Sequence, residues 1–277
     1  MVNWGFSQID ELPAVVAADG WSWSYENLGH DHSQSFWVGT DSGNRRWIVK
    51  MRGAEYAVRE RIYSHFAQQV GICTQSSLYV VVSADAPPIA ALRAPDDSDR
   101  YQLGLLLLAE HAPDPCDATC PLAKATSCGT EQAMFNSWLN SGIVNPWDWF
   151  EAEILGYLCA KHEPSGQLIT RDHRHVQIDN ELMFGGWPFV PGPVSEHALR
   201  YLREESLMTL DGAQRRALAL CERIVQIPPA KLESLCEVPE GYRAEALDTK
   251  ILDWLLQARS TAEHFLLHGL SNRTYQC

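Results

Sequence analysis

The chain changes its hydrophobic periodicity part-way along its length, and this change constrains the fold more than any other feature. Residues 20–50 alternate polar and apolar side chains between turns rich in Gly, Asn, Asp and Ser, which predicts antiparallel strands. From Glu131 onward the apolar spacing is mainly helical, over residues 131–141, 147–160, 195–206, 211–226, 229–236 and 243–268. We therefore predict a β-rich part followed by a mainly helical part.

Local signals place a hairpin and a helix in the β-rich part. The hairpin is predicted to join residues 36–39 to residues 47–50, because a turn sequence at Ser42-Gly43 separates them. Residues 54–70 show helical spacing, and Gly71 is placed to end that helix. The end of the second hairpin strand and the start of the helix are therefore close in the chain.

Further strands are predicted on either side of the change in periodicity. Residues 78–82 and 101–110 are predicted strands, and the prolines and aspartates between them predict a surface loop. Among the later helices, residues 167–169 and 175–178 predict a short hairpin. A ligand cleft between the two parts would be a natural consequence of this arrangement.

The charge balance and the absence of long apolar segments limit the partners. The 277 residues carry a formal net charge of −13 at pH 7, whereas binding to nucleic acid or anionic lipid requires a basic surface. The N-terminus has no basic start followed by an apolar run, and the apolar run at 105–109 is far too short to span a bilayer. We expect a cytoplasmic protein that binds neither nucleic acid nor a membrane.

The eight cysteines are predicted to be reduced thiols, as in most cytoplasmic proteins. Three of them, Cys116, Cys120 and Cys128, lie with His111 in a proline-containing stretch and could supply four zinc ligands. Their spacing is irregular and contains no tight two-residue knuckle. Independent loop thiols are therefore favoured over a structural zinc site.

Three charged residues match the requirements of phosphoryl transfer. This chemistry uses a strand lysine to hold phosphates, a helix glutamate to hold the lysine, and a downstream aspartate to hold the metal. Lys50 ends a predicted strand on the same face as Ile48, Glu60 lies in the next helix, and Asp179 follows the strand at 175–178. Taken singly, Lys50 and Glu60 are more typical of solvated charges, and Asp179 equally fits a turn cap.

The segments that contain these residues resemble the HipA-like kinases and the related phosphatidylinositol kinases. Residues 178–184 resemble the family segment I-D-H-x-x-A-F, whose Asp binds magnesium. Residues 58–72 resemble the family helix N-E-x-x-A-x-x-L-A-x-x-L-G-L, and Lys50 sits where the family places its ATP-binding lysine. Residues 145–148 are similar to the motif that opens the helix before the catalytic loop. The resemblance covers most of the chain in order.

The resemblance implies an α+β, bilobal protein-kinase-like fold. A β-rich N-terminal lobe with one helix is expected at residues 1–110, and a mainly helical C-terminal lobe at residues 131–277. Residues 111–130 would form a linker or insert between them. The whole chain would then be one kinase-like domain.

ATP and Mg²⁺ are the cofactors that the resemblance implies. Asp179 would bind the metal, and the strand at 101–110 would lead to the adenine site. Residues 29–35 stand in place of the usual Gly-rich loop, with hydroxyls that could contact phosphates. The expected nucleotide contacts are Lys50, Glu60, Ser33, Ser35 and Glu110.

The catalytic loop departs from the family pattern D-R-H-x-x-N. His162 fits, but Ala160 replaces the catalytic Asp, and Ser165 stands at the place of the metal-binding Asn. Losing a general base typically costs about 10²–10⁴-fold in rate. Asp179 and His162 stay candidate catalytic residues, and Glu163 and Asp172 are the nearest candidates for a relocated acid. A charged hairpin turn is the favoured interpretation of the segment that contains Asp172.

Three functions follow from this pattern. The first is a degenerate kinase, or pseudokinase, that binds ATP and Mg²⁺ with weak or no conventional activity. The second is an active phosphotransferase that acts on a protein or small molecule with a relocated acid. The third is a non-catalytic protein-interaction module. We rank them in the order first, third, second.

Overall fold

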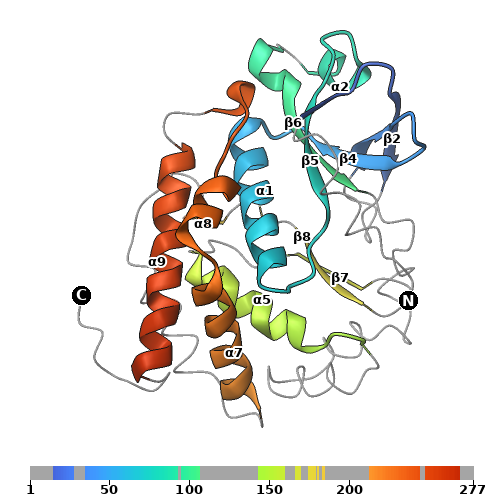
Figure 1. Cartoon of the computed structure of the whole chain (residues 1–277). Coiled ribbons are helices and arrows are strands. Elements are labelled where there is room, and N and C mark those ends of the chain that lie inside the picture. The colour runs from blue at the N-terminus through green and yellow to red at the C-terminus, as the bar shows by residue number, and fades with distance from the viewer. Residues whose placement is uncertain are drawn as a thin grey trace.

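The chain is an α+β protein, as the sequence predicts. A computed structural model describes residues 15–27, 35–92, 95–106, 143–159, 166–169, 174–178, 180, 183–184, 212–243 and 247–268. In these residues a six-stranded sheet lies toward one end of the molecule, and most of the helices lie toward the other (Figure 1). Helix α1, Ala54–Gln69, lies between them.

The six-stranded sheet is mixed, with the order β1-β5-β6-β4-β3-β2. All its neighbours are antiparallel except β1 and β5, which are parallel. The predicted strands are present, but β1 was not predicted, because three residues are too few to show alternation. The strands are β1 Val15–Ala17, β2 Ser22–Asn27, β3 Ser35–Thr40, β4 Arg46–Lys50, β5 Ser77–Val81 and β6 Tyr101–Leu106.

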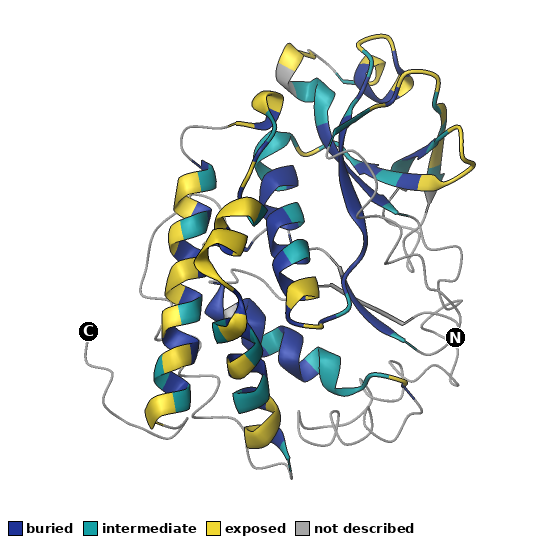
Figure 2. Ribbon diagram, viewed as in Figure 1, coloured by how far each residue is buried: buried dark blue, intermediate teal, exposed yellow. Residues whose placement is uncertain are grey.

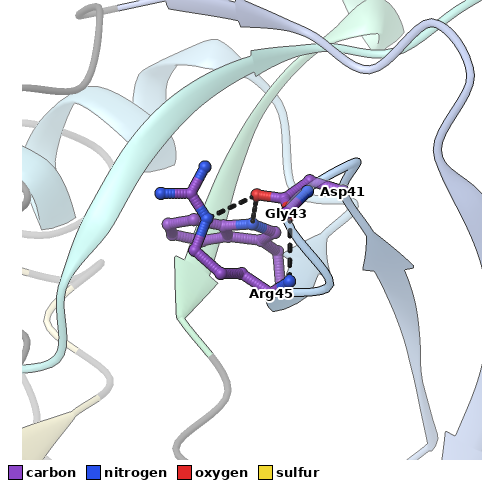
Figure 3. Close-up of polar contacts among 4 residues, drawn as sticks. Asp41, Gly43 and Arg45 are labelled. Carbon is purple, nitrogen blue, oxygen red and sulfur yellow. Dashed lines mark hydrogen bonds and ion pairs between the residues drawn. The ribbon is translucent and has the colours of Figure 1, made fainter.

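The predicted hairpin is formed by β3 and β4, and one carboxylate organises its turn (Figure 3). Asp41 Oδ1 accepts the backbone N–H groups of Gly43 and Arg45, each at 2.9 Å. Asp41 Oδ2 accepts Arg45 Nε at 2.8 Å and Trp47 Nε1 at 3.0 Å. Burial alone would raise the pKa of Asp41, but the hydrogen bonds from Trp47 and Arg45 outweigh it and lower this pKa. The turn thus fixes the register of the strand that ends at Lys50.

Helix α1 is the central packing element. It is buried along most of its length (Figure 2) and contacts β5 and β6 on one side. On the other side it contacts helices α8 (Pro229–Leu235) and α9 (Leu247–His268). The helix ends where predicted, because Gly71 adopts a φ of +84°, which a residue without a Cβ reaches at little cost.

The remaining helices pack into the main hydrophobic core around α1. The outer faces of α7 (Ala213–Gln226), α8 and α9 are exposed, as expected for amphipathic helices on a surface, whereas no described residue of α5 (Trp147–Leu158) is exposed (Figure 2). The predicted second hairpin is also present, as an antiparallel pair of strands. These elements are α5 Trp147–Leu158, β7 Gly166–Ile169, β8 His175–Ile178, α7 Ala213–Gln226, α8 Pro229–Leu235 and α9 Leu247–His268.

Two sequence predictions need correction. The predicted proline-rich surface loop contains a short helix, α2 Pro87–Ala90, and a 3₁₀ turn at Asp97–Arg100. Proline fits the first turn of a helix, where its missing N–H is not needed, so it does not exclude one here. The last helix begins at Leu247 and not at residue 243, because a separate 3₁₀ turn, η4 Glu240–Tyr242, precedes it.

Several predictions lie outside the described residues. These are the helices at 131–141 and 195–206 and the insert at 111–130. The division into two lobes and their boundaries stay a prediction. Within the described part of the chain, no helix combines the length and the apolar character needed to cross a bilayer.

Candidate functional site

Lys50 lies at the end of an interior strand and faces helix α1. Strand β4 runs between β3 and β6, and Lys50 is paired with Leu103 of β6. Alternate residues of a strand point to opposite faces. Trp47 and Val49 are buried in the core on the far side of the sheet, whereas Ile48 packs against the core that contains α1. Lys50 shares the face of Ile48 and therefore points toward α1.

Glu60 of α1 meets this lysine. Lys50 Nζ lies 3.1 Å from Glu60 Oε2 and 3.3 Å from Glu60 Oε1. Only 10% of the Lys50 side chain and 3% of the Glu60 side chain are exposed. The structure therefore brings together two residues that the sequence placed ten positions apart on different elements.

The burial of this ion pair needs an explanation other than stability. Removing two charges from water costs several kcal/mol per ion, and replacing such a pair with apolar residues is often neutral or stabilising. Charged groups that a fold buries despite this cost are often retained because they meet a ligand. The Lys50–Glu60 pair is therefore a candidate functional centre.

The segment that follows β8 docks on the same side of α1. Asn180, which follows Asp179 in the sequence, directs its backbone N–H at Glu60 Oε1 over 3.4 Å. Arg59 Nη1 donates to the Met183 carbonyl at 3.2 Å. Two adjacent helix residues therefore hold the chain just beyond the predicted magnesium aspartate.

Phe184 ends this segment in a strained conformation. Its φ is +59°, which is rare for a bulky residue, and its side chain is fully buried. Its N–H donates to the Cys159 carbonyl at the end of α5, at 2.8 Å, and its ring packs edge-on against Tyr63. Such strain persists only where the surroundings fix it, and it is concentrated at ligand sites and switch regions.

Strand β8 is anchored to the body of the protein on two sides. Gln177 exchanges backbone hydrogen bonds with Cys73 and Gln75, just before β5. Asn145 Oδ1 accepts the His175 N–H at 2.8 Å, and Asn145 Nδ2 donates to the His175 carbonyl at 3.1 Å. These contacts determine where β8 delivers the chain that follows it.

Sequence reasoning missed the roles of Arg59 and Asn145. Arg59 is not among the predicted site residues, yet it is 2% exposed and also pairs with Glu55 at 2.6 Å. The available signal was helical spacing, since Arg59 lies on the same face as Ile62 and Tyr63. No local signal shows that Asn145 binds a strand thirty residues later.

Most of the other predicted site residues lie outside the described residues. Ser35 begins β3, and nothing further is described of its side chain. The undescribed candidates are Asp179, His162, Asp172, Ser165, Ser33 and Glu110, together with Ala160 and the possible zinc ligands His111, Cys116, Cys120 and Cys128. Among the described residues, no group of three or more His, Cys, Asp or Glu side chains is arranged to hold a metal ion.

A pocket of about 550 Å³ lies elsewhere in the molecule. Its walls come from the end of α8, from residues on either side of η4 and from the start of α9. Neither Lys50 nor Glu60 lines it, so the geometry of the ion pair, and not this hollow, identifies the candidate site. Its lining residues are Glu233, Cys236, Glu237, Val238, Pro239, Arg243, Asp248, Thr249 and Leu252.

Comparison with known proteins places the fold. No protein-family model and no curated protein matches the sequence. The proinflammatory kinase CtkA from Helicobacter pylori matches in structure with a TM-score of 0.55 and 9% identity, over 83% of this chain and 94% of CtkA. The chain shares the fold of this kinase. This confirms the predicted resemblance at the level of the fold, which by itself fixes no activity.

A second solved structure matches less closely. HipA from Shewanella oneidensis MR-1, solved with HipB and operator DNA, matches with a TM-score of 0.46 and 12% identity, over 92% of this chain and 66% of HipA. The operator DNA belongs to that HipA structure and is not a finding about the present chain.

Proposed function

We propose that this chain binds ATP with Mg²⁺ beside the Lys50–Glu60 pair and has weak or no conventional kinase activity. The observation that carries the proposal is the buried ion pair itself, with N···O distances of 3.1 and 3.3 Å. In kinase folds a strand lysine of this kind holds nucleotide phosphates while a helix glutamate orients it. Burying the Lys50 ammonium costs free energy, and the negatively charged phosphates of a bound nucleotide would offset part of that cost.

The surroundings of Asn180 fit a magnesium ion. Asn180 Oδ1 is buried without a hydrogen-bond partner among the described residues, and buried carbonyl oxygens normally have one. Mg²⁺ takes oxygen ligands and prefers one or two carboxylates together with substrate phosphates. We propose that Asp179 holds the ion and that the Asn180 amide oxygen lies next to it. The bound ion would neutralise charge on the phosphates.

The loss of conventional activity is proposed from the sequence of the catalytic loop. Ala160 has no group that can orient an attacking hydroxyl, and Ser165 offers a hydroxyl in place of an amide oxygen. Without a positioned base the rate falls by about 10²–10⁴-fold. Nucleotide binding can survive this loss, because Lys50 and Glu60 are retained on separate elements.

Thermal unfolding with MgATP tests the proposal. Ligand at 100 times its Kd stabilises a protein by about 2.7 kcal/mol, which for a chain of this size corresponds to roughly 5–10 °C. This rise in Tm on adding MgATP should disappear in Lys50→Met. It should persist in Lys231→Met, which removes an exposed lysine on α8. Absence of any shift in the unmodified protein at 5 mM nucleotide overturns the proposal. A shift unaffected by Lys50→Met overturns the site assignment.

A phosphate-transfer assay separates a pseudokinase from an active enzyme. We expect no incorporation of labelled phosphate above background into the protein itself or a general acceptor. Robust transfer that is lost in Asp172→Asn would instead support the relocated acid.

A further inference from the structure

Tyr242 joins the C-terminal part of the chain to the sheet through a buried hydroxyl. It belongs to η4, and the connection between α8 and α9 that contains it rises beside the N-terminal end of α1 (Figure 1). The Tyr242 hydroxyl lies 2.6 Å from the Val80 carbonyl of β5 and 2.8 Å from the Gln102 carbonyl of β6. One proton serves both carbonyls, so the hydroxyl links two adjacent strands.

The ring of Tyr242 is held as firmly as its hydroxyl. It packs against Tyr79 at 4.3 Å and edge-on against Tyr101 at 5.4 Å, measured between ring centroids. At Gly241 a Cβ would come within 1.8 Å of the Tyr101 ring, so only glycine permits this approach. The turn is therefore shaped to seat Tyr242 on the sheet.

Gln102, whose carbonyl accepts the Tyr242 hydroxyl, also holds the short connection between β4 and α1 through its side chain. Its side-chain Oε1 accepts the N–H groups of Arg52 and Gly53, each at 3.1 Å. Its Nε2 donates to the Asp99 carbonyl at 2.8 Å, which fixes the orientation of the amide. Gln102 is only 1% exposed, so these bonds do not compete with water.

The connection that Gln102 holds is short. Residues 51–53 are all that separates the end of β4 from the start of α1, and Gly53 has a φ of +89°. The next residue of β6, Leu103, is the strand partner of Lys50. A shift of Gln102 would therefore move both the strand that ends at Lys50 and the origin of the helix that presents Glu60.

We infer that Tyr242 is a positioning residue for the Lys50–Glu60 pair and acts through Gln102. The inference concerns the nucleotide site and so rests on the proposed function. The C-terminal part thereby sets the geometry of an ion pair whose two members both come from the first 60 residues of the chain.

The reactivity of Lys50 tests the inference without requiring nucleotide. The protein is acylated with an amine reagent across a pH series at a temperature well below unfolding, and modification of Lys50 is followed by peptide mass spectrometry. Tyr242→Phe removes only the hydroxyl. We expect its Lys50 to react at least fivefold faster, with a changed pH profile, because the pair is less well held. MgATP affinity should fall by about tenfold.

Two controls separate positioning from a general loss of stability. Tyr101→Phe removes a hydroxyl from the neighbouring ring, and Phe265→Leu trims a buried side chain toward the far end of α9. Neither should alter the rate or pH profile of Lys50 modification. Gln102→Met removes the acceptor for Arg52 and Gly53, and it should reproduce the Tyr242→Phe result and serve if Tyr242→Phe does not fold.

The outcomes distinguish this inference from the proposed function. An unchanged Lys50 rate and pH profile in folded Tyr242→Phe and Gln102→Met overturns the inference, even if MgATP binds the unmodified protein. If the unmodified protein binds no nucleotide, the proposed function fails, and faster Lys50 modification in both variants still supports the positioning role.

Discussion

A double-mutant cycle on Lys50 and Glu60 probes whether the pair is retained for function at a cost in stability. Lys50→Met removes the ammonium that lies 3.1 Å from Glu60 Oε2 and leaves the Glu60 carboxylate buried without it. Breaking a buried pair in this way costs about 3–5 kcal/mol, whereas replacing both members is often neutral or stabilising. We therefore expect Lys50→Met/Glu60→Gln to be more stable than Lys50→Met alone.

The size of the loss can be compared with an exposed pair on the same strand. Arg46 of β4 pairs with Glu26 of β2, but 45% and 30% of these side chains are exposed. Exposed pairs typically contribute about 0.2–1 kcal/mol. Arg46→Met should therefore destabilise the protein several times less than Lys50→Met.

Urea unfolding followed by tryptophan fluorescence measures these free energies by linear extrapolation. The reasoning is refuted if Lys50→Met costs no more than Arg46→Met, or if the effects of Lys50→Met and Glu60→Gln simply add. Either result would mean that the pair is effectively solvated and that its burial carries no information about function.

Three further predictions concern the frame around the pair. Asn145→Ala should cost about 1–3 kcal/mol, because it leaves the buried N–H and carbonyl of His175 without this partner, and urea unfolding measures the loss. Burial lowers the pKa of His175 to about 3 from 6.5, so its contribution to stability is complete above pH 6.5 and is lost as the pH falls toward 3, by up to about 1.4 kcal/mol per unit. His175→Gln should make unfolding free energies less steep between pH 6.5 and 4, and an unchanged slope counts against this assignment. Gly241→Ala should cost about 1–3 kcal/mol by forcing the Tyr101 ring to move, whereas an unchanged Tm would show that the turn is loose.

The sequence predicted the elements that have their own periodicity. Alternation and turn residues gave the β3–β4 hairpin, and helical spacing with Gly71 gave the limits of α1. Strand β4 of this hairpin carries Lys50, and α1 carries Glu60. The contact between Lys50 and Glu60 therefore follows from locally predicted elements, once α1 packs on the face of the sheet that Lys50 shares.

Contacts between distant segments could not be predicted in the same way. Tyr242 reaches carbonyls of β5 and β6 that lie 162 and 140 residues earlier, and backbone carbonyls leave no mark in the sequence. The buried state of Arg59 depends on the Met183 carbonyl, 124 residues away. Such partners are set by tertiary packing and not by residue type.

The assigned roles of Asp179, His162, Asp172 and Ser165 stay predictions. They depend on the family resemblance, because these four residues lie outside the described part of the chain. The N–H of Asn180 on Glu60 places the residue next to Asp179 at the Lys50–Glu60 pair. It makes Asp179 the first of these residues to test.

A crystal structure with a non-hydrolysable ATP analogue and magnesium tests the central claim most directly. The account predicts electron density for the analogue with a phosphate oxygen within hydrogen-bond distance of Lys50 Nζ, and a metal ion bound by the carboxylate of Asp179. Density for the analogue at any other place on the molecule, or none in crystals soaked at saturating concentration, would contradict it.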